Sequence, residues 1–169
     1  MRTKSDKEKY GRLVKAYAAE VVDFTARLLP DRMEAEEVAQ DAFVRAFSRL
    51  DSFRGDATFL TWVQRIAYHE AIDRLRRRQP TMADISEVPL AAEDDADLST
   101  EREERIQRLE ESIDELPPDD QLLLHLYYYE DRPLRDIAYI MDTEPNTLSA
   151  RLYRIRKRLL HMIKQKTDE

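Results

Sequence analysis

The residues best suited to chemistry lie near the C-terminus, where a predicted helix carries a run of positive charge. Between Asn146 and Lys166 the chain has no acidic residue and seven basic ones: Arg151, Arg154, Arg156, Lys157, Arg158, Lys164 and Lys166. Arginine side chains pair with guanine edges or clamp phosphates. The pattern therefore favours nucleic-acid binding, although a solvated basic face would have the same composition.

The segments before this helix predict a helix-turn-helix. A short helix-like segment covers Leu134–Met141, turn-like residues occupy 142–145, and the basic helix follows. Pro145 suits a first helical turn, where backbone N–H groups have no partner, and Asp142 tolerates the left-handed backbone of a tight turn. Two short helices joined in this way are typical of a duplex-DNA reader.

The apolar stripe of the basic helix indicates which side chains remain available. Steps of four, three and four residues place one row against the domain: Leu148, Leu152, Ile155 and Leu159. The side chains off that stripe are candidates for contact with DNA: Thr147, Ala150, Arg151, Arg154 and Arg158.

A second basic cluster ends the predicted helix 58–78, with Arg74, Arg76, Arg77 and Arg78. Basic side chains are stabilised near a helix C-terminus. Four basic residues among five positions are more than this stabilisation requires, so a phosphate-contact patch explains them at least as well. Phe59 and Trp62 lie on the apolar stripe and are expected in the core. Phe53 and Tyr68 fall off it and are the better candidates for stacking on unpaired bases.

Composition predicts an all-α protein made of two small helical domains. The chain has 169 residues, of which only 2 are Gly and none is Cys. Helices are expected over 7–29, 32–50 and 58–78, with a loop at 51–56, and Asp31 with Glu34 predicts a capping box. The predicted divisions are an N-terminal domain over 1–79, an acidic linker over 80–104 and a C-terminal domain over 105–169.

The acidic charge is concentrated in the predicted linker. Nine acidic residues and one basic residue lie between Asp84 and Glu104, so this segment carries −8 against −7 for the whole chain and leaves +1 elsewhere. Such a polar segment is poorly suited to a packed core. Two interpretations of this segment are a solvated tether between the domains and a strand that mimics the charge of nucleic acid.

Enzyme, metal and membrane functions find no support. The two glycines form no phosphate-binding loop, no cysteine is present, and His69-Glu70 lacks the second histidine of a zinc helix because Asp73 stands there. No cofactor or metal is therefore expected. No apolar stretch approaches a membrane span, and the charged N-terminus is unlike a secretion signal. A cytoplasmic protein that is not an enzyme is expected.

Several of these segments together resemble a known family. Residues 35–43 (AEEVAQDAF), 53–56 (FRGD), 59–67 (FLTWVQRIA) and 71–78 (AIDRLRRR) resemble region 2 of bacterial RNA polymerase sigma factors, and most of all the extracytoplasmic-function (ECF) type, group 4 of the sigma-70 family. Residues 116–118 (LPP) and 136–159 resemble region 4. The two blocks cover about 10–79 and 105–163 in the family's order.

The resemblance implies a promoter-specificity subunit that binds core RNA polymerase through Glu37, Gln40 and Asp41. The loop 51–56 and the helix after it would open the −10 element and hold an extruded base, with contacts from Phe53, Arg54, Tyr68, His69, Arg74, Arg76, Arg77 and Arg78. The second domain would read the −35 element with Thr147, Ser149, Ala150, Arg151, Tyr153, Arg154 and Arg158.

The resemblance also implies a linker that threads toward the RNA exit path and an anti-sigma factor as a probable partner. The chain departs from the family at three positions: His69 where Asn is frequent, Ser149 where Lys or Arg is usual, and Ala150 where Ser is common. Two alternatives to a sigma factor remain at this point. One is a stand-alone helix-turn-helix regulator that binds duplex DNA as a dimer, and the other is a helical module whose basic helix binds an acidic protein.

Overall fold

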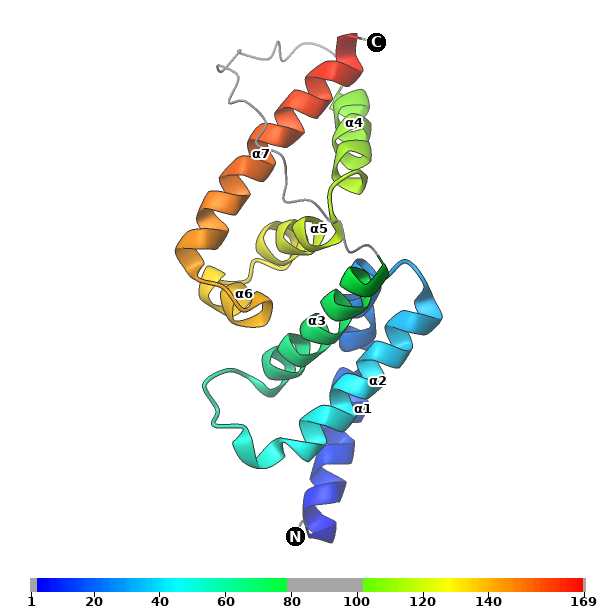
Figure 1. Ribbon diagram of the computed structural model, residues 1–169, viewed down its shortest axis with the longest axis vertical. Helices are drawn as coiled ribbons and strands as arrows, with labels where there is room; N and C mark the ends of the chain where they lie inside the picture. The colour runs from blue at the N-terminus through cyan, green and yellow to red at the C-terminus, as the bar shows by residue number, and fades with distance from the viewer. Residues whose placement is uncertain (1–2, 79–101, 169) are drawn as a thin grey trace.

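The computed structural model describes residues 3–78 and 102–168, and every regular element within them is helical (Figure 1). The N-terminal block holds α1 (Lys4–Leu28), α2 (Arg32–Ser48), a 3-10 turn (Leu50–Ser52) and α3 (Phe59–Arg78). The C-terminal block holds α4 (Arg102–Asp114), α5 (Pro118–Leu124), a π-helical turn (His125–Tyr129), α6 (Leu134–Met141) and α7 (Pro145–Asp168). The all-α prediction is confirmed.

The predicted linker falls mostly outside the described residues. Of its range 80–104, only the last three residues are described, and they form the first turn of α4. Helix α4 therefore includes the last residues of the predicted linker.

Local capping explains where the first two helices begin. Thr3 accepts a hydrogen bond from the backbone N–H of Asp6, whose side chain accepts one in return, so α1 starts with a complete capping box. Asp31 caps α2 through the N–H of Met33 at 2.9 Å. The capping box predicted at Asp31 is only half formed, because the side chain of Glu34 is buried and pairs instead with arginines of α3.

Small side chains let the helices of the N-terminal block approach closely. On α2 four alanines are at most 1% exposed: Ala35, Ala39, Ala42 and Ala46. Larger side chains from α1 and α3 fill the space around them, among them Val21, Phe24, Leu28, Val63 and Ile66. This alternation of small and large residues gives one packed core among the three helices.

The C-terminal block contains the predicted helix-turn-helix. Helix α6 has the predicted bounds, and α7 begins at Pro145. Asp142 adopts the left-handed backbone conformation, with φ 54°, as its tolerance for that region predicted. The predicted apolar stripe of α7 is buried throughout, which confirms it: Leu148, Leu152, Ile155 and Leu159. Helix α4 packs along the C-terminal half of α7 (Figure 1).

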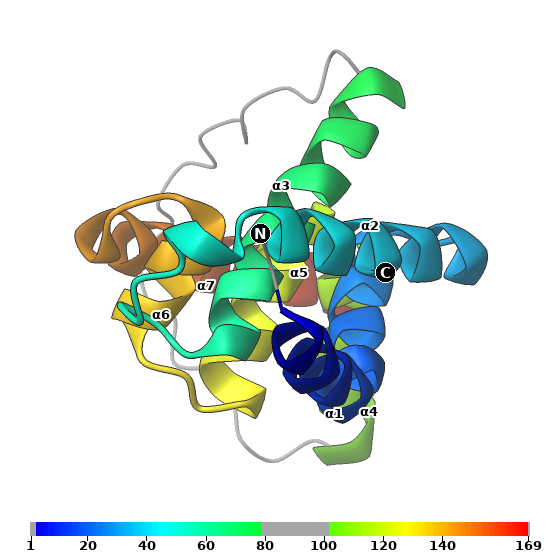
Figure 2. The ribbon, with the colours of Figure 1, turned by 90° about the horizontal axis from the view of Figure 1, so that it is seen from below.

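The two blocks pack against each other. Helix α6 lies on α3, and α5 contacts α1. Figure 1 shows α6 directly above α3, and Figure 2 shows the same pair from below, with the N-terminus of α1 toward the viewer. The helix-turn-helix therefore sits on the helix that was predicted to contact the −10 element.

Candidate nucleic-acid and partner-binding surfaces

Most of the residues predicted to read the −35 element lie on one exposed surface of α7. The exposed members are Thr147, Ser149, Ala150, Tyr153 and Arg154. The ammonium group of Lys157 lies 5.4 Å from the centre of the Tyr153 ring, within the range of a cation–π contact. This surface offers hydroxyl groups, a ring and a guanidinium, which can contact base edges and phosphates.

Arg151 has a different environment from these neighbours. Its Nε lies 2.7 Å from Oδ1 of Asp120, and its Nη2 lies 2.7 Å from Oδ2 of Asp119. Asp120 is fully buried, and this burial raises the pKa of its carboxyl although Arg151 and Arg158 oppose the shift. Arg151 therefore ties α7 to α5. The sequence did not reveal this contact because the partners lie about thirty residues away.

The residues predicted to stack on −10 bases are less accessible than expected. Tyr68 was predicted to lie off the apolar stripe and to be available for stacking, but this availability is wrong for the conformation described: only 8% of Tyr68 is exposed. Phe53 is half-buried, with its ring centre 4.9 Å from that of Trp62. Arg54 and His69 are exposed. His69 reaches to 3.9 Å from a carboxylate oxygen of Asp142.

The arginine cluster at the end of α3 divides into two sets. Arg74 is only 18% exposed in its side chain, because it forms ion pairs within 3.6 Å with four carboxylates: Glu34, Glu37, Asp41 and Glu70. Hydrogen bonding to Glu37 raises the pKa of Arg74. Arg78 pairs with Glu34 at 2.5 Å although its side chain is 56% exposed, and Arg76 and Arg77 are exposed as well. Half of the predicted phosphate patch thus fastens α3 to α2.

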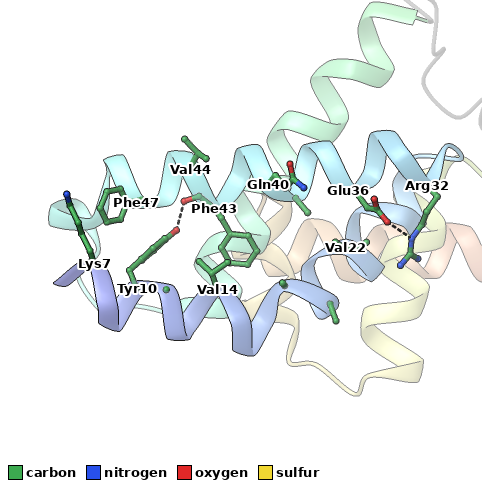
Figure 3. A pocket seen from close by; sticks show the side chains of 14 residues that line it. Lys7, Tyr10, Val14, Val22, Arg32, Glu36, Gln40, Phe43, Val44 and Phe47 are labelled. Carbon is green, nitrogen blue, oxygen red and sulfur yellow. Dashed lines mark hydrogen bonds and ion pairs between the residues drawn. The ribbon is translucent and has the colours of Figure 1, made fainter. Parts of the chain in front are cut away.

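The three residues predicted to dock on polymerase also lie in two different environments. Glu37 and Asp41 face Arg74, at 3.1 and 3.3 Å. Gln40 instead lines a groove of about 910 Å³ between α1 and α2 (Figure 3). The groove walls are largely apolar, with Val14 from α1 and Phe43 and Val44 from α2.

Sequence reasoning missed this groove, although a signal was present. Val44 is apolar but lies off the buried face of α2, and it is 68% exposed. Figure 3 shows Tyr10 of α1 reaching across the base of the groove to donate a hydrogen bond to the backbone carbonyl of Phe43. This bond holds the two walls of the groove together.

Within residues 3–78 and 102–168, no three His, Asp or Glu side chains are grouped so that they could hold a metal ion. Within the same ranges, no helix combines the length and apolar character needed to cross a bilayer.

Comparisons with known proteins match both blocks. The Sigma-70 region 2 family matches residues 10–81, and the Sigma-70 region 4 family matches residues 106–159. The chain is 32% identical over 165 residues to the RNA polymerase sigma-H factor of Pseudomonas aeruginosa, covering 91% of this chain and 86% of that protein. It is 30% identical over 170 residues to the ECF RNA polymerase sigma factor SigW of Bacillus subtilis, covering 92% and 89%.

Solved structures share the fold. The sigma factor RpoE of Bartonella quintana, solved in complex with the anti-sigma factor NepR, has a TM-score of 0.64 at 20% identity, covering 93% of this chain and 98% of that one. CnrH, solved in complex with the cytosolic domain of CnrY, has a TM-score of 0.61 at 18% identity, covering 94% and 90%. The family models match both blocks, and the similarity to the two relatives extends over more than nine-tenths of this chain. This chain belongs to the sigma-70 family of RNA polymerase sigma factors, in its ECF group.

Proposed function

We propose that this chain is an alternative sigma factor that binds core RNA polymerase in the cytoplasm and directs it to promoters with a −35 and a −10 element. The observation that carries the proposal is the presence of both blocks in one chain, aligned with sigma factors over 91% of its length. A stand-alone helix-turn-helix regulator would account for residues 116–166 but not for the N-terminal block. In this proposal the protein acts as a specificity subunit and performs no reaction itself.

The C-terminal block would read the −35 element with the exposed surface of α7. Thr147, Ser149, Tyr153 and Arg154 are the side chains on this surface with the capacity to donate hydrogen bonds to bases or phosphates. The N-terminal block would contact the −10 element through Arg54, His69, Arg76 and Arg77, which are exposed. Arg74, Arg78 and Arg151 would contribute mainly by holding the helices in place.

Core polymerase would dock on the groove between α1 and α2. Gln40 belongs to the predicted docking set and also lines the groove, where exposed Val44 supplies apolar area. A helix of the polymerase with an apolar face fits such a surface. An anti-sigma factor remains part of the proposal as a further partner. The similar structure from Bartonella quintana is of a sigma factor bound to such a partner, but its low identity supports the fold alone.

In vitro transcription tests the function. The purified protein is mixed with bacterial core polymerase and fragmented DNA from the source genome, and transcript starts are mapped. We expect starts that share two short elements at a fixed spacing. Binding to a palindromic duplex in the absence of polymerase, together with no binding to core, would contradict the proposal and favour the dimeric regulator.

Docking variants test the groove. Gln40→Ala and Val44→Ala should weaken binding to core polymerase at least tenfold, because truncating a hot-spot residue at the centre of an interface costs about 2 kcal/mol or more. Glu20→Ala is the matched control, since Glu20 is exposed on α1 and lies outside the groove lining. Equal affinity for all three variants would rule out the groove as the docking site.

A further inference from the structure

The turn between α5 and α6 presents tyrosine side chains that neither the core nor the proposed surfaces use. It contains the π-helical turn His125–Tyr129, and such turns are rare and frequently lie at functional sites. Tyr128 is 55% exposed and Tyr129 is 82% exposed. A phenol combines an apolar ring with a hydroxyl group that donates and accepts hydrogen bonds, so two exposed phenols beside the helix-turn-helix are candidates for contact with a partner.

The two exposed phenols have different contacts. The hydroxyl oxygen of Tyr128 accepts a hydrogen bond at 2.5 Å from Nη1 of Arg156 in α7. The ring of Tyr127 packs edge-on against the ring of Tyr128, with their centres 4.9 Å apart. The ring of Tyr129 instead stacks on His125, with centres 4.8 Å apart and planes 23° apart. Tyr128 is therefore joined to α7, whereas Tyr129 lies against its own turn.

The positive charge of Arg156 is not neutralised by this contact, because its partner is a neutral phenol. Arg156 is exposed, and in the part of the chain that the structure describes it forms no ion pair with a carboxylate. Arg151 of the same helix differs, since it is tied to two aspartates of α5. The remaining N–H groups of Arg156 and the O–H of Tyr128 are still available as donors. Arg156 is therefore an oriented cation that can still accept an anion.

Arg156 lies at one edge of the α7 surface that is proposed to read the −35 element. Ser149, Tyr153 and Arg156 follow steps of four and three residues, so they share one side of the helix. Residues three apart on a helix have Cβ atoms about 5–6 Å apart, which makes Arg156 a direct neighbour of Tyr153. Thr147 and Arg154 point to the other side of that surface by the same spacing rule. Tyr128 therefore flanks the surface on the side of Ser149 and Arg156.

The flank of a recognition helix meets phosphates rather than bases. An α-helix with its side chains is about 10–12 Å across and the major groove is about 12 Å wide, so the helix fills the groove. Side chains at the centre of its exposed face reach the base edges, and those at its flanks face the phosphates along the groove walls. Arginine and tyrosine are among the side chains that donate hydrogen bonds to these phosphates. Arg156 and Tyr128 have both the position and the donors for such a contact.

We propose that Arg156 and Tyr128 together bind one backbone phosphate of duplex DNA at the edge of the −35 element. The guanidinium and the phenol O–H donate to the phosphate oxygens, and the hydrogen bond between the two side chains orients the guanidinium before DNA binds. A side chain that is already ordered loses less conformational entropy on binding. This inference rests on the proposed function and deepens it, because the phosphate contact positions α7 in the groove without reading sequence.

DNA binding at several salt concentrations tests the phosphate site. The full-length protein with core polymerase is titrated against a labelled promoter fragment from the transcription experiment, and the full-length protein alone is titrated against a random-sequence duplex. The test variants are Arg156→Ala, Arg156→Lys and Tyr128→Phe. Tyr129→Phe is the matched control for the loss of an exposed phenol hydroxyl in the same turn. Arg12→Ala is the control for the loss of one exposed arginine, because Arg12 lies on α1.

We expect Arg156→Ala to weaken binding to both duplexes about tenfold, as the loss of a hydrogen bond from a charged donor implies. The slope of log K against log salt concentration should become smaller by about 0.9, the value for one lost phosphate contact. Arg156→Lys should retain the wild-type slope, because it keeps the charge. Tyr128→Phe should weaken binding about fivefold with the slope unchanged, because it removes a neutral donor. Both control variants should match the wild type.

Wild-type affinity and slope in Arg156→Ala and Tyr128→Phe would overturn the phosphate site. A loss that Arg156→Ala shows on the promoter fragment alone, with no change in slope, would also overturn it, because that result is the signature of a base contact. Equal losses in Tyr128→Phe and Tyr129→Phe would show that the pairing with Arg156 has no part in binding. If the wild type failed to direct transcription, the proposed function would fall, and the random-sequence duplex would still decide whether Arg156 and Tyr128 bind phosphate.

Discussion

Arg151 provides a test of whether an arginine of α7 stabilises the fold or contacts DNA. The sequence predicted that Arg151 contacts the −35 element, but the structure pairs it with Asp119 and with fully buried Asp120, whose Oδ1 lies 2.6 Å from Nη2. Arg151→Ala would leave the Asp120 carboxylate buried without its cation. We therefore expect this change to lower the free energy of unfolding.

The expected decrease in the free energy of unfolding follows from the burial of the ion pair between Arg151 and Asp120. Breaking a buried ion pair by removing one partner costs about 3–5 kcal/mol. The lower end applies here, about 3 kcal/mol, because the side chains of Arg151 and Asp119 are each about a quarter exposed and water can reach them. Arg154→Ala, one turn further along α7 at an exposed position, should change stability by less than about 0.5 kcal/mol.

The pH dependence of the loss provides a second signature. Burial already raises the folded-state pKa of Asp120, and removing Arg151, which lowers it, raises that pKa further. The folded state then binds more protons than the unfolded state between the two pKa values, so stability falls as pH rises through that window. The defect of Arg151→Ala should therefore be larger at neutral pH than in mildly acidic buffer.

Urea denaturation followed by far-UV circular dichroism measures these differences for the wild type, Arg151→Ala, Arg154→Ala and the double variant Asp120→Asn/Arg151→Ala. The double variant should recover part of the lost stability, because it removes the unpaired charge. Equal and small losses for Arg151→Ala and Arg154→Ala at both pH values, with promoter binding lost in both, would refute the structural role and restore Arg151 as a DNA contact.

Three further predictions follow from the same structure. Arg132 donates hydrogen bonds to Gln64 and Thr61 of α3 at 2.6 and 2.7 Å. Arg132→Ala should loosen the packing that buries Tyr68 and lower the pKa of Tyr68 from about 12 toward its usual value of 10, as read by NMR of ring-labelled tyrosine; an unchanged pKa would mean that this packing stays intact. Gly55→Ala should lower the free energy of unfolding by about 1 kcal/mol, because Gly55 has φ +79°. Gly11→Ala in α1 should raise the free energy of unfolding by up to about 1 kcal/mol, because the added methyl group meets no atom within 4 Å. Thermal denaturation that shows a change of the same sign for both variants would contradict this prediction. Arg74→Ala should destabilise the N-terminal block by about 3 kcal/mol in urea, and a loss as small as that of the exposed-site variant Arg77→Ala would show that the ion pairs contribute little.

Local patterns in the sequence were sufficient to predict α6 and the buried stripe of α7, and to predict α1, α2 and α3 to within a few residues, whereas the first turn of α4 was assigned to the linker. The bounds of α6, the left-handed turn at Asp142 and the stripe that begins at Leu148 were all predicted correctly. These features depend on contacts between residues a few positions apart, such as caps, helical spacing and backbone preferences. The family resemblance likewise rests on short motifs, and the full-length relatives confirm it.

The tertiary structure alone decided which charged and aromatic side chains are available. Arg74, Arg151 and Tyr68 looked like surface residues because their own helices offered no reason to bury them. Apart from Glu70 on the helix of Arg74 itself, the partners of the two arginines lie 31 to 40 positions away, as with Asp120 and Glu34, and Tyr68 is buried near Asp119 of the other block. The spacing of residues along one helix carries no information about which distant side chain will face it, so these ion pairs and the burial of Tyr68 appear only when the chain folds.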